Sequence, residues 1–124
     1  MNDIGIEETI AQINSHVNKF QWMDFEVHQY HDEHLQIHGG IDLLEKPDIR
    51  IIFSRVFFAA TPFEWKTETS ADSLVLVQGD EARELNLRYQ VVEGIYIFKF
   101  IAEDYPKDFG CYIGAEKIWF DRSV

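Results

Sequence analysis

Four histidines within eleven residues form the one cluster in this chain whose side chains could do chemistry. They are His28, His31, His34 and His38, and Glu26 stands just before them. Imidazole and carboxylate groups are common ligands of zinc and nickel ions in proteins. The composition of this segment therefore raises the hypothesis of a metal site formed by Glu26, His28, His34 and His38, with zinc as its candidate cofactor.

Two short strands would have to position these side chains. Residues 25–30 and 35–38 alternate between apolar and polar side chains, which is typical of strands with one buried face. A loop of two residues would put Phe25 and Val27 on the histidine face and waste their burial. We therefore expect a three-residue loop, 31–33, with the apolar residues of both strands on one face: Phe25, Val27, Leu35 and Ile37.

In this register the histidines of both strands project from the opposite face. Glu26 then lies across from His38, and Tyr30 lies across from His34. Residues two apart on a strand are about 6.6 Å apart, which is wide for ligands that share one ion. The same face could instead be a solvated polar surface, or a pH sensor whose clustered imidazoles gain charge together below about pH 6.5.

The chain is strongly acidic. Its 124 residues carry 22 acidic and 11 basic side chains, for a formal net charge of −11, and only Lys19 and Lys46 are basic before Arg50. A field of this sign repels phosphate backbones, which argues against a nucleic-acid partner, and it favours cationic partners. Acidity also keeps a small protein soluble without any other role. The candidate partner-binding residues are Asp32, Glu33, Asp42, Glu45 and Trp65.

Motifs for catalysis are missing from the sequence, which has no nucleophile elbow, no phosphate-binding glycine loop and no CxxC pair. The one cysteine, Cys111, stands among aromatic residues, which favours a buried and inert thiol. A single cysteine also suits a reducing compartment. The chain shows neither a signal-peptide pattern nor an apolar run of about twenty residues. We therefore expect a non-enzymatic, cytoplasmic protein without a membrane partner.

An amphipathic helix is predicted near the N-terminus, over about residues 4–20. Apolar residues recur there at spacings of four, three, four and three, which places them on one helical face. Such a stripe usually packs on the rest of its own domain. The residues of the stripe are Ile6, Ile10, Ile13, Val17 and Phe20.

Residues 84–100 predict a β-hairpin in the middle of the chain. Apolar and polar residues alternate from Glu84 to Val91, and Glu93-Gly94 offers a turn in which glycine tolerates a positive φ. With a two-residue loop, apolar residues meet across the hairpin on one face. The expected pairs are Val91 with Tyr96, Tyr89 with Phe98, and Leu87 with Phe100.

The remaining strands are expected at 49–58, 74–77, 111–113 and 117–120, with a bulge or bend near Ser54-Arg55. Trp65 and residues 66–73 are expected in a loop. One helix followed by seven or eight mostly antiparallel strands predicts an α+β fold that is sandwich-like, with two packed sheets and the helix against one of them. We expect one domain over 1–124, with the β region at about 25–122.

Several segments between roughly residues 25 and 120 form a recurring pattern of strand hydrophobics. They are Leu35-Gln36-Ile37, Ile49-Arg50-Ile51-Ile52-Phe53, Val56-Phe57-Phe58, Trp65 after a proline, and Gly114-Ala115-Glu116-Lys117-Ile118-Trp119-Phe120. With these segments the chain resembles small bacterial immunity proteins of polymorphic toxin systems. The resemblance implies a non-catalytic protein that binds and blocks a cognate toxin, and an acidic blocker would suit the cationic active site of a toxin nuclease.

Overall fold

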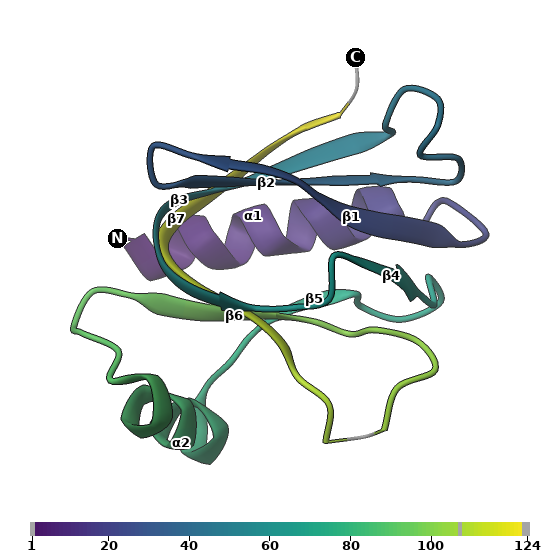
Figure 1. Cartoon of the computed structure of the whole chain (residues 1–124). Coiled ribbons are helices and arrows are strands. Elements are labelled where there is room, and N and C mark those ends of the chain that lie inside the picture. The colour runs from purple at the N-terminus through teal and green to yellow at the C-terminus, as the bar shows by residue number, and fades with distance from the viewer. Residues whose placement is uncertain (1, 107, 123–124) are drawn as a thin grey trace.

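An N-terminal helix lies inside the curve of an antiparallel sheet (Figure 1). The computed structural model describes residues 2–106 and 108–122, apart from the side chains of residues 2–4. Helix α1 spans Asn2–Val17, and its apolar stripe is buried as predicted. Phe20 follows the helix and packs on the same core. The stripe consists of Ile6, Ile10, Ile13 and Val17, each at most 8% exposed.

Seven strands follow within the described residues, in the spatial order β4-β1-β2-β3-β7-β6-β5. Every neighbouring pair of strands in this order is antiparallel. The α+β class is therefore confirmed. The strands are β1 (Met23–His31), β2 (His34–Gly40), β3 (Ile49–Ala60), β4 (Glu64–Thr67), β5 (Leu74–Leu76), β6 (Tyr96–Phe100) and β7 (Cys111–Arg122).

One curled sheet replaces the two packed sheets that the sequence predicted. Strands β3 and β7 bend along their length and join the layer of β1 and β2 to that of β6 and β5 (Figure 1). The bend in β3 coincides with a register shift between Val56 and Phe58, and Arg55 has a positive φ of 55°. The predicted irregularity near Ser54-Arg55 is thus confirmed, and it allows the sheet to curl. The segments at 111–113 and 117–120 are parts of one strand, β7.

The predicted hairpin over 84–100 is wrong, because its first half is helical. Helix α2 spans Gly79–Tyr89, with acidic residues in its first turn and Gln90 in a left-handed conformation at its C-terminus. Only Leu85 of this helix is buried, and Leu87 is 76% exposed. The alternating leucines therefore did not mark a buried strand face. Strand β6 pairs with β5 and β7 instead, so the three expected cross-strand pairs do not form.

Glu81 anchors helix α2 to the sheet. Its Oε2 accepts hydrogen bonds from Lys99 Nζ at 2.9 Å and from Tyr112 Oη at 2.7 Å. Burial raises the pKa of Glu81, but these hydrogen bonds outweigh it and bring the pKa below its usual value of 4.5. Because the pKa is lower in the folded state, the stabilisation is present above pH 4.5 and is lost as the pH falls.

The stability difference between the wild type and Glu81→Gln is therefore expected to be largest at neutral pH and to shrink below about pH 4.5. Urea unfolding at a series of pH values measures it. Glu84→Gln is a matched control, since it removes an exposed carboxylate from the same helix. A difference that grows as the pH falls would contradict the assigned role of Glu81.

Candidate functional site on strands β1, β2 and β4

The hairpin of β1 and β2 positions the histidines that the sequence singled out. Its turn has two residues, Asp32 and Glu33, both with positive φ, rather than the three expected. Tyr30 consequently pairs with Leu35, and not with His34 as predicted. The error arises because, without an irregularity in the strand, a two-residue turn would place Phe25 and Val27 on the histidine face.

A β-bulge at His28 restores the register that the apolar pattern predicted. The pairing shifts between Val27 and Gln29, which leaves His28 as the extra residue of β1. Beyond the bulge, Val27 pairs with Ile37 and Glu26 pairs with His38, as expected. The extra residue in the strand thus compensates for the missing residue in the loop.

The bulge brings together three of the four predicted metal ligands. Glu26, His28 and His38 each offer a ligand atom, and these atoms all lie within 4.8 Å of one another. The rings of His28 and His38 stack, with centroids 3.9 Å apart and planes inclined by 12°. The expected separation of about 6.6 Å for residues two apart on a strand does not apply here, because the bulge displaces His28. We call these three residues the histidine cluster.

The fourth predicted ligand, His34, lies outside the histidine cluster. It sits at the start of β2 and pairs with His31 across the turn. Its Nδ1 is 2.8 Å from the backbone oxygen of Asp32, so this nitrogen donates to the turn. His34 and His31 line a different hollow, over β2, β3 and β7, together with Arg50 and others.

His38 is held in its neutral form. Burial, the nearby His28 and the charge of Arg50 together lower the pKa of His38 from 6.5 to about 4. Arg50 is its cross-strand partner on β3. The Nε2 atom of His38 lies 2.8 Å from Gln36 Oε1. Because an amide oxygen only accepts, Nε2 donates this hydrogen bond and Nδ1 keeps its lone pair.

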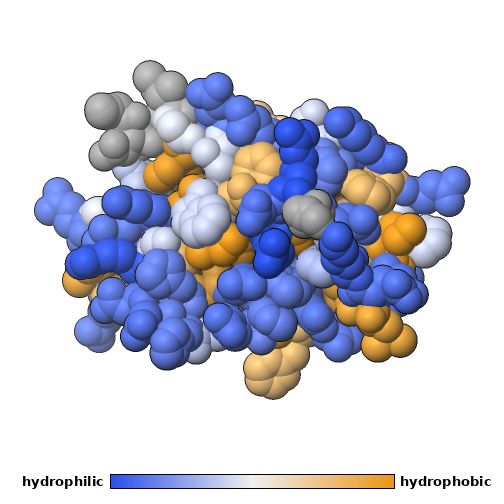
Figure 2. Space-filling view, turned by 90° about the horizontal axis from the view of Figure 1, so that it is seen from above, coloured by the Kyte–Doolittle hydropathy of each residue, from blue (hydrophilic) through white to orange (hydrophobic). Residues whose placement is uncertain are grey.

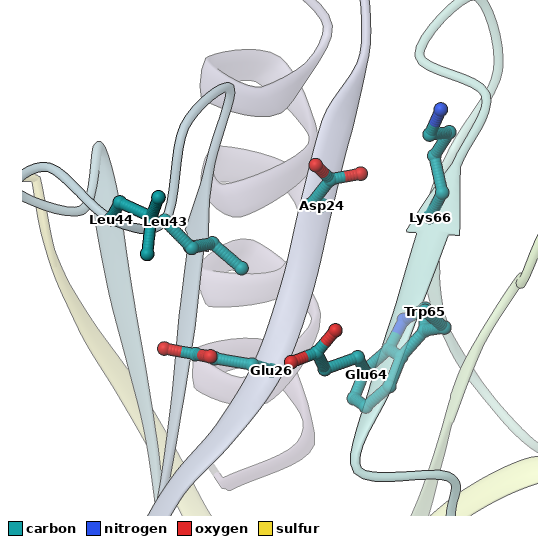
Figure 3. Close-up of a pocket in the computed structure, with 7 residues that line it drawn as sticks. All are labelled: Asp24, Glu26, Leu43, Leu44, Glu64, Trp65 and Lys66. Carbon is teal, nitrogen blue, oxygen red and sulfur yellow. The ribbon is translucent and has the colours of Figure 1, made fainter.

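A hollow of about 470 Å³ lies beside the histidine cluster, and we call it the acidic hollow. Figure 3 shows Glu64 reaching from β4 toward β1, while Glu26 on β1 points toward the loop that carries Leu43 and Leu44. Glu26 therefore belongs both to the histidine cluster and to the acidic hollow. The residues that line the acidic hollow are Asp24, Glu26, Leu43, Leu44, Glu64, Trp65 and Lys66.

Charges in the acidic hollow are unbalanced. Asp24 pairs across the strands with Lys66, which is a favourable combination, but Glu26 pairs directly with Glu64. Like charges directly opposite each other on a sheet repel. On the rim, Leu44 is 96% exposed. The acidic hollow thus combines an excess of carboxylates in its lining with an exposed apolar side chain at its rim.

The predicted partner-binding residues divide between two places. Asp42 and Glu45 lie in the same loop as Leu43 and Leu44, between β2 and β3, and so stand next to the acidic hollow. Asp32 and Glu33 form the hairpin turn and do not line the hollow.

Trp65 is in strand β4 rather than in a loop and is only 5% exposed. Its ring stacks on Phe25 at 5.8 Å and packs against Phe100 at 5.0 Å. The indole therefore supports the hollow from the core side.

Sequence reasoning missed Asp24, Glu64 and Leu44 as lining residues. Asp24 carried a signal, because it precedes buried Phe25 and strand alternation turns it outward. Glu64 and Leu44 carried none, since both lie outside the strands that the sequence predicted.

Comparisons with protein-family models, with curated proteins and with solved structures give no match for this chain. The resemblance to immunity proteins therefore stays a prediction. Neither helix in the described part of the chain is long and apolar enough to cross a membrane.

Proposed function

We propose that this chain is a non-catalytic binding protein of the immunity or inhibitor type, which blocks a cationic protein such as a toxin. The observation that carries the proposal is the acidic hollow, where three carboxylates lie beside the exposed Leu44. A basic side chain of a partner would fit between Asp24, Glu26 and Glu64. Leu44 would supply the apolar contact that holds such a partner in place.

Two wider features support the same proposal. The net charge of −11 creates a long-range field that speeds the encounter with a cationic protein. Hydrophilic residues predominate on the face seen in Figure 2, and apolar groups are exposed there only in separate patches. This distribution suits an interface formed mainly by charge complementarity.

A cytoplasmic location belongs to this proposal as well. Cys111 is fully buried, and burial raises the pKa of its thiol to about 12, so the cysteine is unreactive. A chain with one inert thiol needs no oxidising compartment. An immunity protein would act where its toxin is made, which is consistent with such a location.

The purified product of an adjacent gene is the partner to test first. We expect it to bind the wild-type chain, and to bind the double variant Asp24→Lys/Glu64→Lys at least tenfold more weakly, because lysines that repel a cationic partner replace two of the three lining carboxylates. Titration calorimetry gives the affinity, and stopped-flow mixing at several salt concentrations gives the association rate. The association rate should fall with increasing salt.

The matched control is Glu8→Lys/Glu93→Lys, which changes the net charge equally at exposed positions away from the acidic hollow. It should weaken binding far less than the hollow variant does. Equal losses in both variants would mean that the hollow is not the binding face. No binding of any adjacent toxin-like product by the wild type would overturn the proposed function.

A further inference from the structure

We infer that Glu26, His28 and His38 form a binding site for a divalent transition-metal ion of the zinc class. The inference goes beyond the proposed function and does not depend on a protein partner. Its first basis is the convergence of the three side chains, whose ligand atoms lie within 4.8 Å of one another. Two imidazoles and one carboxylate are the donor set of many zinc sites with an open fourth position.

The distances require only a small closure. With metal–ligand bonds of about 2.0–2.2 Å, ligand atoms in a tetrahedral site are about 3.3–3.6 Å apart. The ligand atoms of the three residues lie within 4.8 Å of one another, so the longest separation has to shorten by at most about 1.2–1.5 Å. The rings of His28 and His38 are stacked, so His28 must also rotate out of the stack before the lone pairs of both rings can point at one ion. His28 is exposed and sits at a bulge, so rotation about its side-chain bonds can supply both movements while the β1–β2 ladder stays intact.

The surroundings of His38 prepare it as a ligand. The hydrogen bond from Nε2 to Gln36 Oε1 fixes the tautomer in which Nδ1 carries the lone pair. A partner on the second ring nitrogen is the usual way in which proteins orient a metal-binding histidine. Gln36 is thus a positioning residue for the site, and its hydrogen bond leaves Nδ1 as the nitrogen of His38 with a free lone pair.

Unrelieved negative charge beside the cluster also favours a cation. Glu26 and Glu64 are cross-strand partners on β1 and β4, and no ion pair with a lysine or arginine is found for either carboxylate in the described part of the chain. A divalent ion held by Glu26 would offset this repulsion. The remaining coordination position would be filled by water.

Zinc titration of the metal-free chain, without any polyhistidine tag, tests the site. Calorimetry is expected to show one equivalent of Zn²⁺ bound, and a cobalt-loaded sample should show the visible absorption of a tetrahedral site. His28→Ala and His38→Ala should each weaken zinc binding more than tenfold. Circular dichroism and urea unfolding would confirm that both variants remain folded.

His34→Ala is the matched control, because this residue lies on the same hairpin but outside the cluster. It should leave the zinc affinity within about twofold of the wild type. The inference is overturned if the wild type binds no zinc, or if His34→Ala weakens binding as much as His28→Ala does. Because the partner test changes Asp24 and Glu64 and reads protein binding, the two proposals can fail separately.

Discussion

Replacing Phe100 by alanine is expected to lower the free energy of unfolding by about 3–5 kcal/mol, the range for removing a large aromatic side chain from a packed core. Phe100 is 1% exposed and lies at the centre of the aromatic core. Its ring centroid is 5.2 Å from that of Phe25, 5.0 Å from Trp65 and 6.2 Å from Phe53. The cavity left by alanine would remove contacts with all three rings at once.

Urea unfolding measures this loss, and Phe63→Ala is the control. Phe63 is 83% exposed, so its truncation should change the free energy of unfolding by no more than about 0.5 kcal/mol. A loss below about 1.5 kcal/mol for Phe100→Ala would contradict the packing described here. The variant also tests the acidic hollow, because Trp65 packs on Phe100 from strand β4 and the neighbouring Glu64 lines the hollow.

Replacing Asn14 by alanine is expected to cost about 2–4 kcal/mol, the largest effect that we expect from a polar side chain. Asn14 is 5% exposed and links helix α1 to strand β5. Its Oδ1 accepts hydrogen bonds from the backbone N–H groups of Ser73 at 3.0 Å and Leu74 at 3.1 Å. Its Nδ2 donates to the Leu74 oxygen at 2.9 Å. Alanine would leave these buried backbone groups without partners.

The control for Asn14→Ala is Gln12→Ala, an exposed position on the same helix. It should change the free energy of unfolding by less than about 0.5 kcal/mol. Amide hydrogen exchange adds a local measurement, since the N–H groups of Ser73 and Leu74 should lose protection in Asn14→Ala. Unchanged protection at both amides would show that Asn14 does not hold β5 in place.

The elements that could be predicted are those whose periodic pattern had one interpretation. The helical stripe from Ile6 to Val17 fits only an amphipathic helix, and all four of its residues are buried. The break in alternation near Ser54-Arg55 could be interpreted as a bulge, because these two polar residues interrupt the apolar run from Ile51 to Phe58. In the helix and in the strand alike, the prediction was possible because one buried face gives a regular pattern of apolar residues.

Residues 84–91 were mispredicted because two periodicities overlap there. Leu85, Leu87 and Tyr89 alternate as in a strand, but Leu85 and Tyr89 are also four apart, as on one face of a helix. Strong helix formers surround them, and acidic Asp80 and Glu81 stand in the first turn. Local propensity decided the structure, since the segment buries only Leu85.

The candidate site could be predicted in part. The composition of the hairpin pointed to Glu26, His28 and His38, and the apolar register correctly paired Glu26 with His38. The close approach of His28 could not be foreseen, because it depends on a bulge whose position the polar sequence does not mark. The acidic hollow was missed because β4 is a four-residue edge strand, too short to show alternation.

The bulge at His28 has a further consequence for the open side of β1. Strand β4 pairs with β1 only over Met23–Glu26, so the outer edge of residues 28–31 has no ladder partner among the described residues. A flat, open edge recruits strands from other chains and promotes aggregation. An irregular backbone followed by the charged turn Asp32-Glu33 opposes such stacking. The residue that completes the histidine cluster therefore also helps to keep neighbouring molecules apart at high concentration.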